Sequence, residues 1–67
     1  MTVEQELQEA IEAVHAASAL VREQEATIAT MKAAGIDTSR AESLSSAYRA
    51  AARFAAERRD WLQTQVK

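Results

Sequence analysis

Apolar residues in the first half of the chain recur every seven positions. Leu7, Val14, Val21 and Ile28 form one series. A second series at the neighbouring seam position contains Val3, Ala10, Ala17, Gln24 and Met31. Two mostly apolar positions per seven residues are typical of helices that pack in a bundle or coiled coil. The pattern predicts a helix over residues 3–34, whose core seam includes Leu7, Val14, Val21 and Ile28.

Apolar residues in the second half are spaced by three and four and predict a second helix over residues 38–66. The predicted apolar stripe contains Leu44, Ala47, Tyr48, Ala51, Phe54, Ala55, Trp61 and Leu62. Charged residues such as Arg49, Arg53 and Glu57 occupy the opposite face. The apolar arc is wider than one neighbouring helix requires, so we expect this helix to contact more than one partner helix.

A turn at residues 35–37 separates the two predicted helices. Gly35 is the only glycine and the chain has no proline. Glycine favours the left-handed conformation just after a helix, and Asp37 is suited to cap the next helix. With Asp37 as the cap, Ile36 would cover Ala41 as a hydrophobic staple.

The other possibility is a cap at Ser39, with Glu42 completing a capping box. With either cap the turn is short, and a short turn folds two long helices back on each other. The sequence therefore predicts an all-α fold, an antiparallel two-helix hairpin that forms one domain over residues 1–67.

The position of the turn also predicts which residues face each other. With the turn centred near Gly35, Ile28 lies opposite Leu44. In the same register Val21 lies opposite Ala51, whose small side chain would let the helices approach closely. We therefore add Leu44 and Ala51 to the predicted core seam.

Two polar residues interrupt the predicted stripes, Gln24 in the first helix and Arg58 in the second. Polar residues in a seam usually fix register or oligomeric state at some cost in stability. In the predicted register Gln24 lies opposite Tyr48, which would allow a hydrogen bond between its amide and the Tyr48 hydroxyl.

The composition leaves little material for a core. Half of the hydrophobic residues are alanines, 16 in all, and only three residues are aromatic. A core of this size rarely supplies more than about 3–5 kcal/mol, so small chains usually add disulfides, a metal or a partner. There is no cysteine, and we expect neither metal nor cofactor. A partner chain is the remaining way to add stability. We expect that partner to be a second copy, giving a homodimer in which two hairpins form a four-helix bundle.

The same features argue against an enzyme. The chain is too small to surround a substrate and also supply a catalytic set. His15 is the only histidine, and it has no recognisable triad or ligand partners. The acids Glu4, Glu6, Glu9 and Glu12 do not repeat as a Glu-x-x-His motif. We therefore expect no catalytic residue.

Charge and hydropathy limit the classes of partner that the chain is expected to bind. The net charge is −2, without the basic excess of nucleic-acid-binding domains. No apolar run reaches the length of a membrane span, and the N-terminal region is acidic, unlike a signal peptide. We expect a cytoplasmic protein that does not bind membranes or nucleic acid. A nucleic-acid reading would use the arginines of the second helix, Arg40, Arg49, Arg53, Arg58 and Arg59.

The aromatic residues of the second helix are the strongest candidates for binding. Tyr48, Phe54 and Trp61 are expected along one flank, with Arg58 and Leu62 beside them. Such a row usually packs in a core or a dimer interface. The alternative is an exposed row of anchors for another protein, since Trp, Tyr and Arg dominate binding hot spots.

The segment from Met31 to Leu44 reads MKAAGIDTSRAESL. It resembles a turn in small bacterial helical-hairpin proteins, in which Ala-Gly-x-Asp-Thr-x-x-Ala-Glu-x-Leu joins two amphipathic helices. The resemblance implies the hairpin and no activity. Small alanine-rich hairpins are also similar to accessory proteins of phages and prophages that bind and disable a host regulator.

These observations favour a non-enzymatic module that docks a rigid helical surface on a partner protein and modulates or inhibits it. One alternative is a small nucleic-acid-associated protein that uses the arginines of the second helix. The other is a purely structural oligomerisation unit.

Overall fold

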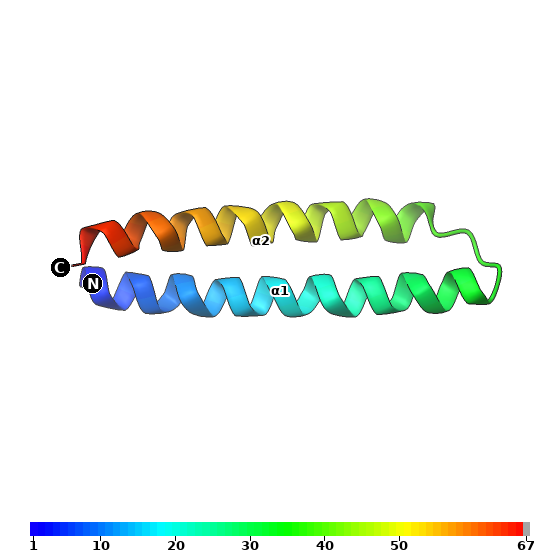
Figure 1. Cartoon of the computed structure of the whole chain (residues 1–67), viewed down its shortest axis with the longest axis horizontal. Coiled ribbons are helices and arrows are strands. Elements are labelled where there is room, and N and C mark those ends of the chain that lie inside the picture. The colour runs from blue at the N-terminus through cyan, green and yellow to red at the C-terminus, as the bar shows by residue number, and fades with distance from the viewer. Residues whose placement is uncertain (67) are drawn as a thin grey trace.

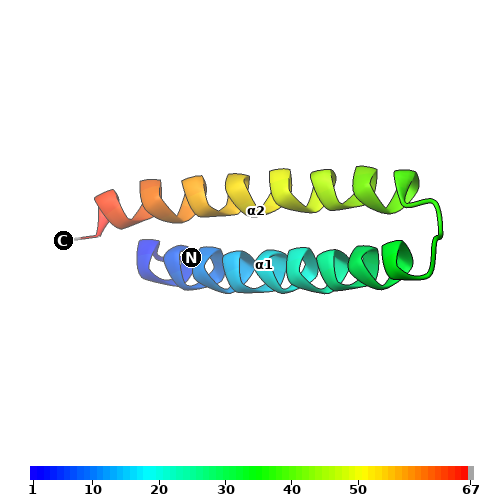
Figure 2. The ribbon, with the colours of Figure 1, turned by 45° about the vertical axis from the view of Figure 1, so that its right-hand side comes forward.

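A computed structural model describes residues 1–66. They form two helices, α1 (Val3–Ala33) and α2 (Ser39–Gln65), which run antiparallel side by side (Figure 1). The molecule measures 51 × 16 × 13 Å. A second view shows the same two-helix layer, with the start of α1 and the end of α2 at one end and the turn at the other (Figure 2). The predicted all-helical antiparallel hairpin is confirmed.

A capping box starts α1. The Thr2 hydroxyl accepts a hydrogen bond from the Gln5 backbone N–H at 3.1 Å, and the Gln5 side chain accepts one from the Thr2 backbone N–H at 2.9 Å. Glu4 and Glu6 lie in the first turn, where negative charge is favourable beside the positive end of the helix dipole.

A Schellman motif ends α1. The Ile36 backbone N–H donates to the Met31 carbonyl at 2.9 Å, and the Gly35 N–H donates to the Lys32 carbonyl at 3.1 Å. Gly35 has φ of 73°, the left-handed conformation that this motif requires. The chain therefore leaves α1 at the residue that the sequence indicated.

The start of α2 differs from both predicted caps. Thr38 is the cap residue, and its side chain makes no capping hydrogen bond. Asp37 lies one position earlier, and its carboxylate accepts from the Ser39 backbone N–H at 3.0 Å and the Ser39 hydroxyl at 2.7 Å. Ile36, expected to cover Ala41, is 53% exposed. The reason is that Ile36 completes the end of α1 and so is not placed to start α2.

The inward face of α1 follows the predicted seven-residue series. Ala10 and Ile28 are buried, and Leu7, Val14 and Val21 are half-buried. A hairpin has only one partner helix for each seam residue, so most seam side chains keep some contact with solvent. The core is correspondingly thin: among residues 1–66 the buried hydrophobic side chains are Ala10, Ile28 and Leu62.

The inward face of α2 is the point at which the structure corrects the prediction. We name the inward-facing residues the inner stripe: Thr38, Ala41, Ser45, Tyr48, Ala52, Ala55, Arg59 and Leu62, all buried or half-buried. Leu44 and Ala51, which were predicted to lie in the core seam, are both exposed. The predicted register along the helix axis was within one residue of the observed one, because Ile28 lies beside Ser45, the residue after Leu44. The predicted rotation was wrong by one residue, or about 100°.

The physical reason for this rotation is side-chain size. Ser45 and Ala52 are small and lie beside Ile28 and Val21 of α1, so α2 approaches these larger residues closely with this face inward. Leu44 and the aromatic Phe54 would hold the helices further apart. Close packing of two helices is favoured by small residues opposite large ones.

The position of Gln24 is a second correction. Its side-chain amide donates to the Ala41 backbone carbonyl at 3.1 Å, so the predicted hydrogen bond to the Tyr48 hydroxyl is wrong. Because α2 is rotated, a backbone carbonyl of α2 comes within reach of this polar seam residue. The bond links α1 to the first turn of α2.

Neither α1 nor α2 is long and apolar enough to cross a membrane.

Candidate protein-binding surface

The large apolar residues of α2 lie mainly on its solvent-facing side. We name these residues the outer stripe: Leu44, Ala47, Ala51, Phe54, Arg58 and Trp61, all of them exposed. They are spaced alternately by three and four residues, which keeps them on one face of a helix. α2 therefore has two faces with the same spacing, one of which packs on α1.

The exposure of the outer stripe is large. Phe54 is 72% exposed, Trp61 is 61% exposed and Leu44 is 44% exposed. Full burial of one such side chain is worth about 1.5–3 kcal/mol. A partner that covered all three would gain several kilocalories per mole, a large amount compared with the stability of a chain of this size.

α1 contributes to the same edge of the hairpin. Leu20, which is 43% exposed, directly precedes the seam residue Val21. Leu44 and Ala51 likewise directly precede inner-stripe residues. In an antiparallel pair, residues that precede the first seam position of each repeat lie at the same edge. Leu20 is therefore placed beside the outer stripe.

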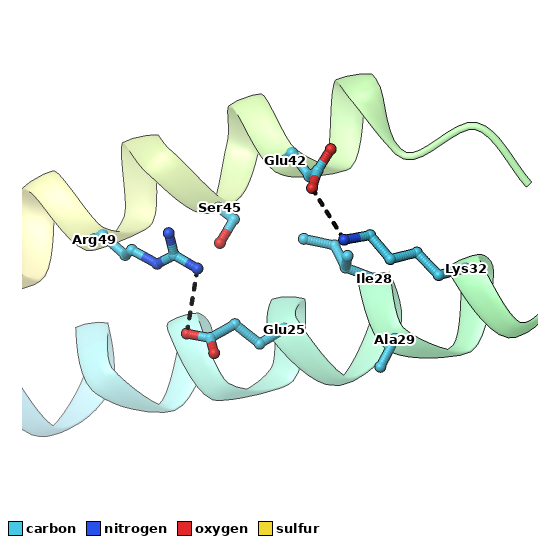
Figure 3. A pocket seen from close by; sticks show the side chains of 7 residues that line it. All are labelled: Glu25, Ile28, Ala29, Lys32, Glu42, Ser45 and Arg49. Atoms are coloured by element: carbon cyan, nitrogen blue, oxygen red, sulfur yellow. Dashed lines mark ion pairs between the residues drawn. The ribbon is translucent and has the colours of Figure 1, made fainter.

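The opposite edge of the hairpin is polar. Glu25 pairs with Arg49 at 3.7 Å, and Lys32 pairs with Glu42 at 3.4 Å. Between these ion pairs lies an open hollow of about 280 Å³, which Ser45 also lines. Figure 3 shows the Ser45 hydroxyl pointing from α2 toward α1. All four charged side chains are more than half exposed, so each pair contributes only about 0–1 kcal/mol and mainly favours this register.

Ser45 is the most buried side chain at that edge. It is 1% exposed, and its hydroxyl has no hydrogen-bond partner among residues 1–66. A buried serine in a helix commonly donates to the carbonyl four residues earlier, which here belongs to Ala41. That carbonyl already accepts from Gln24. The arrangement leaves the buried Ser45 hydroxyl without a hydrogen bond among residues 1–66.

The five candidate binding residues fall on both faces of α2. Phe54, Arg58 and Trp61 belong to the outer stripe, whereas Tyr48 is half-buried and Leu62 is buried in the inner stripe. The predicted single flank of Tyr48, Phe54 and Trp61 is therefore wrong for Tyr48. Six residues advance a helix by about 600°, so Tyr48 lies about 120° away from Phe54, whereas seven residues bring Trp61 back to within about 20°.

The candidate polar residues do not gather into a reactive group. His15 is exposed on α1. Residues 1–66 contain no cluster of three or more His, Asp or Glu side chains that could hold a metal ion. Asp37 has a pKa below its usual range, because the Ser39 backbone N–H and hydroxyl donate to its carboxylate. These hydrogen bonds belong to the turn.

The arginines of α2 do not share one surface, because their side chains have different neighbours. Arg49 pairs with Glu25 of α1, and Arg59 is half-buried beside Asp60 at 2.9 Å. Arg58 lies in the outer stripe between Phe54 and Trp61. Two of the arginines that motivated the nucleic-acid hypothesis are thus paired with acids.

Searches among protein-family models, curated proteins and solved structures find no match to this chain.

Proposed function

We propose that this chain is a non-enzymatic protein-binding module, which docks the outer stripe of α2 on a partner protein and modulates or inhibits it. The observation that carries the proposal is the exposure of Phe54 and Trp61 on one face. Proteins that act as monomers rarely leave a large continuous apolar patch in water. Trp and Arg are also enriched among the residues that dominate binding energy.

The geometry of α2 suits a rigid docking surface. Phe54 and Trp61 are seven residues apart, so their anchor points are about 10 Å apart along one face. Arg58 lies between them and offers a charged group beside the two rings. In the folded hairpin α2 packs against α1 along its length, which holds the docking face in one orientation.

Self-association belongs to the same proposal. Two hairpins that cover each other's outer stripe would form a four-helix bundle. In that case the chain is also a structural oligomerisation unit, the alternative that the same exposed residues favour. The chain would then work as a homodimer.

The kind of partner follows from the resemblance of such hairpins to phage and prophage accessory proteins. By that analogy the partner is a regulatory protein of a bacterial host, which the hairpin inhibits by covering its surface. The chain would act in the cytoplasm, where the absence of cysteine is of no disadvantage to a small fold.

Affinity capture from the native host tests the proposal. The tagged wild-type chain is compared with Phe54→Ala/Trp61→Ala, and nuclease treatment removes nucleic acid. We expect one stoichiometric protein partner that the double variant binds at least about 30-fold more weakly, as loss of hot-spot residues implies.

Ala26→Glu is the matched control, because Ala26 is exposed on α1 and lies outside the outer stripe. We expect it to retain the partner. Equal capture by the wild type and the double variant would contradict the proposal. Capture that disappears with nuclease would favour the nucleic-acid alternative instead.

A further inference from the structure

We propose that the occupant of the outer stripe is a second copy of this chain, bound in one antiparallel register about a two-fold axis level with Ala52 and Arg53. This inference rests on the proposed function, because it takes the outer stripe as a docking surface. It adds the identity of the occupant and the residues that meet. The argument uses surface area, side-chain size and charge.

The surface area of the hairpin is large for its mass. The chain exposes 4895 Å², whereas a compact monomer of 7.3 kDa is expected to expose about 4,200 Å². The excess is about 700 Å², close to the roughly 800 Å² that each partner buries in a standard protein interface. Burial of one face against the hairpin of a second copy is therefore enough to bring the exposed area of each chain to the expected value.

When two outer stripes lie antiparallel, small residues of one copy lie opposite large residues of the other. In the proposed register Ala51 lies opposite Phe54 of the second copy, and by symmetry Phe54 lies opposite the other Ala51. Ala47 lies opposite Arg58, so a small residue again meets a long one. At each end Leu44 meets Trp61. Every outer-stripe residue then has a counterpart.

Other registers fit less well. A parallel arrangement sets Phe54 against Phe54 and Arg58 against Arg58, so it places like charges together and leaves alanines facing alanines. An antiparallel shift of one heptad toward the turn sets Arg40 against Arg58. Like charges in an interface cost several kilocalories per mole.

The opposite antiparallel shift sets Phe54 against Arg58 and moves Leu44 past Gln65, where α2 of the second copy ends. Its contacts then leave a large apolar side chain exposed. The proposed register is the one that covers Leu44, Phe54 and Trp61 together.

Arg58 fits the interface because its side chain has two parts. Its aliphatic stem can cover Ala47 of the second copy, while its guanidinium reaches solvent at the rim. No buried acid is needed to compensate its charge. The interface therefore avoids the cost of an unpaired buried ion.

The position of Leu20 supports the same axis. Glu25 of α1 is level with Arg49 of α2, as their ion pair shows. Five residues earlier along α1, and five later along antiparallel α2, Leu20 is level with Phe54. Leu20 therefore lies near the proposed axis, where two copies of this exposed side chain approach each other and close the four-helix bundle.

Disulfide cross-linking tests the register, because the chain has no cysteine of its own. Ala47→Cys and Arg58→Cys chains, one carrying a tag of distinct mass, are unfolded, mixed, refolded and mildly oxidised. We expect the 47–58 heterodisulfide as the main product. Homodisulfides at 47 should be scarce, because two copies of that position lie about 16 Å apart along the helices.

Mixing Ala26→Cys with Arg58→Cys is the control, and it should give no enrichment of the mixed product. Predominant 47–47 and 58–58 products would show a parallel dimer and would overturn the proposed register. A random mixture of all products, equal to that of the control, would overturn it as well.

Sedimentation equilibrium provides the second measurement. The wild type should sediment at about twice the 7.3 kDa chain mass. Ala51→Glu should raise the dissociation constant at least about 30-fold, because it places a charge beside Phe54 of the second copy. Ala26→Glu should leave the constant unchanged, and circular dichroism should show that each of the three chains is helical at concentrations where it is a dimer.

The two proposals can fail separately. A wild-type chain that stays monomeric at millimolar concentration would overturn the second-copy inference. The protein-binding proposal would still stand if host capture depended on Phe54 and Trp61. Conversely, a dimer with the predicted cross-link and capture independent of these residues would overturn the partner-docking proposal and leave the dimer in place.

Discussion

At the scale of single residues, the end of α1 depends on Gly35. Its φ of 73° lies in the region that a side chain with Cβ resists. A Cβ built at this position would meet no other atom within 4 Å. The preference for glycine is therefore a property of the backbone conformation alone.

Replacing this glycine should consequently destabilise the hairpin without a steric clash. We expect Gly35→Val to lower the free energy of unfolding by at least about 1 kcal/mol, since a β-branched residue strongly resists positive φ. Gly35→Asn should cost less, because Asn tolerates the left-handed region. Thermal melts of the three chains measure the effect, and identical midpoints would contradict the assigned role of Gly35.

Ser45 is a residue whose removal should stabilise the chain. Its hydroxyl is buried and has no partner among residues 1–66, and a buried polar group without a hydrogen bond costs about 1–3 kcal/mol. Ser45→Ala removes that group and keeps a small side chain between the helices. We expect the free energy of unfolding to rise by about 1 kcal/mol or more in denaturant titrations.

Ser46→Ala is the matched control, because Ser46 is exposed. Both substitutions gain about half a kilocalorie per mole in helix propensity. The additional gain in unfolding free energy at Ser45 therefore measures the cost of the buried hydroxyl. Equal gains at the two positions would show that the Ser45 hydroxyl has a water partner that offsets its burial.

At the scale of elements, the start of α2 depends on the Asp37 carboxylate. This group accepts two hydrogen bonds from Ser39, and they lower its pKa. A carboxyl whose pKa is lower in the folded state stabilises that state above its unfolded pKa. The stabilisation is lost as the pH falls through the folded pKa.

Asp37→Ala should therefore have an effect that depends on pH. At pH 6 the variant should melt below the wild type, because the first turn of α2 loses both bonds. As the pH falls from about 5 to about 2, the two melting temperatures should converge. Circular dichroism melts at several pH values measure the difference, and a gap that stays constant across this range would contradict the role of the charged form.

At the scale of the whole molecule, a 51 Å hairpin with three buried hydrophobic side chains among residues 1–66 has little core of its own. Three of its large apolar residues, Leu44, Phe54 and Trp61, lie in the outer stripe and are exposed. Folding and association are expected to be coupled, because covering this face adds the apolar burial that a single hairpin lacks.

Dilution tests this coupling. If two chains fold as one unit, the melting temperature should rise with protein concentration. Trp61 emission should shift to the red on dilution, because its ring is 61% exposed in the single hairpin and covered in the proposed dimer. A melt and an emission maximum that are both independent of concentration would contradict coupled folding.

The sequence by itself determined the features that depend on local interactions. The seven-residue series marks α1 and its inward face, and the propensities and capping groups mark both helices. Gly35 marks the turn, because the left-handed conformation is decided within the Schellman motif. Predicted bounds of 3–34 and 38–66 differ from the observed Val3–Ala33 and Ser39–Gln65 by one residue at three of the four ends.

The tertiary structure alone decided which face of α2 packs on α1. Both the inner and the outer stripe repeat by three and four, so spacing cannot distinguish them. Hydrophobicity favoured Leu44, Phe54 and Trp61, but the closeness of two helices depends on the sizes of both facing surfaces. Ser45 and Ala52 lie beside Ile28 and Val21 of α1. This joint fit turns Phe54 and Trp61 outward, where they form the candidate binding surface.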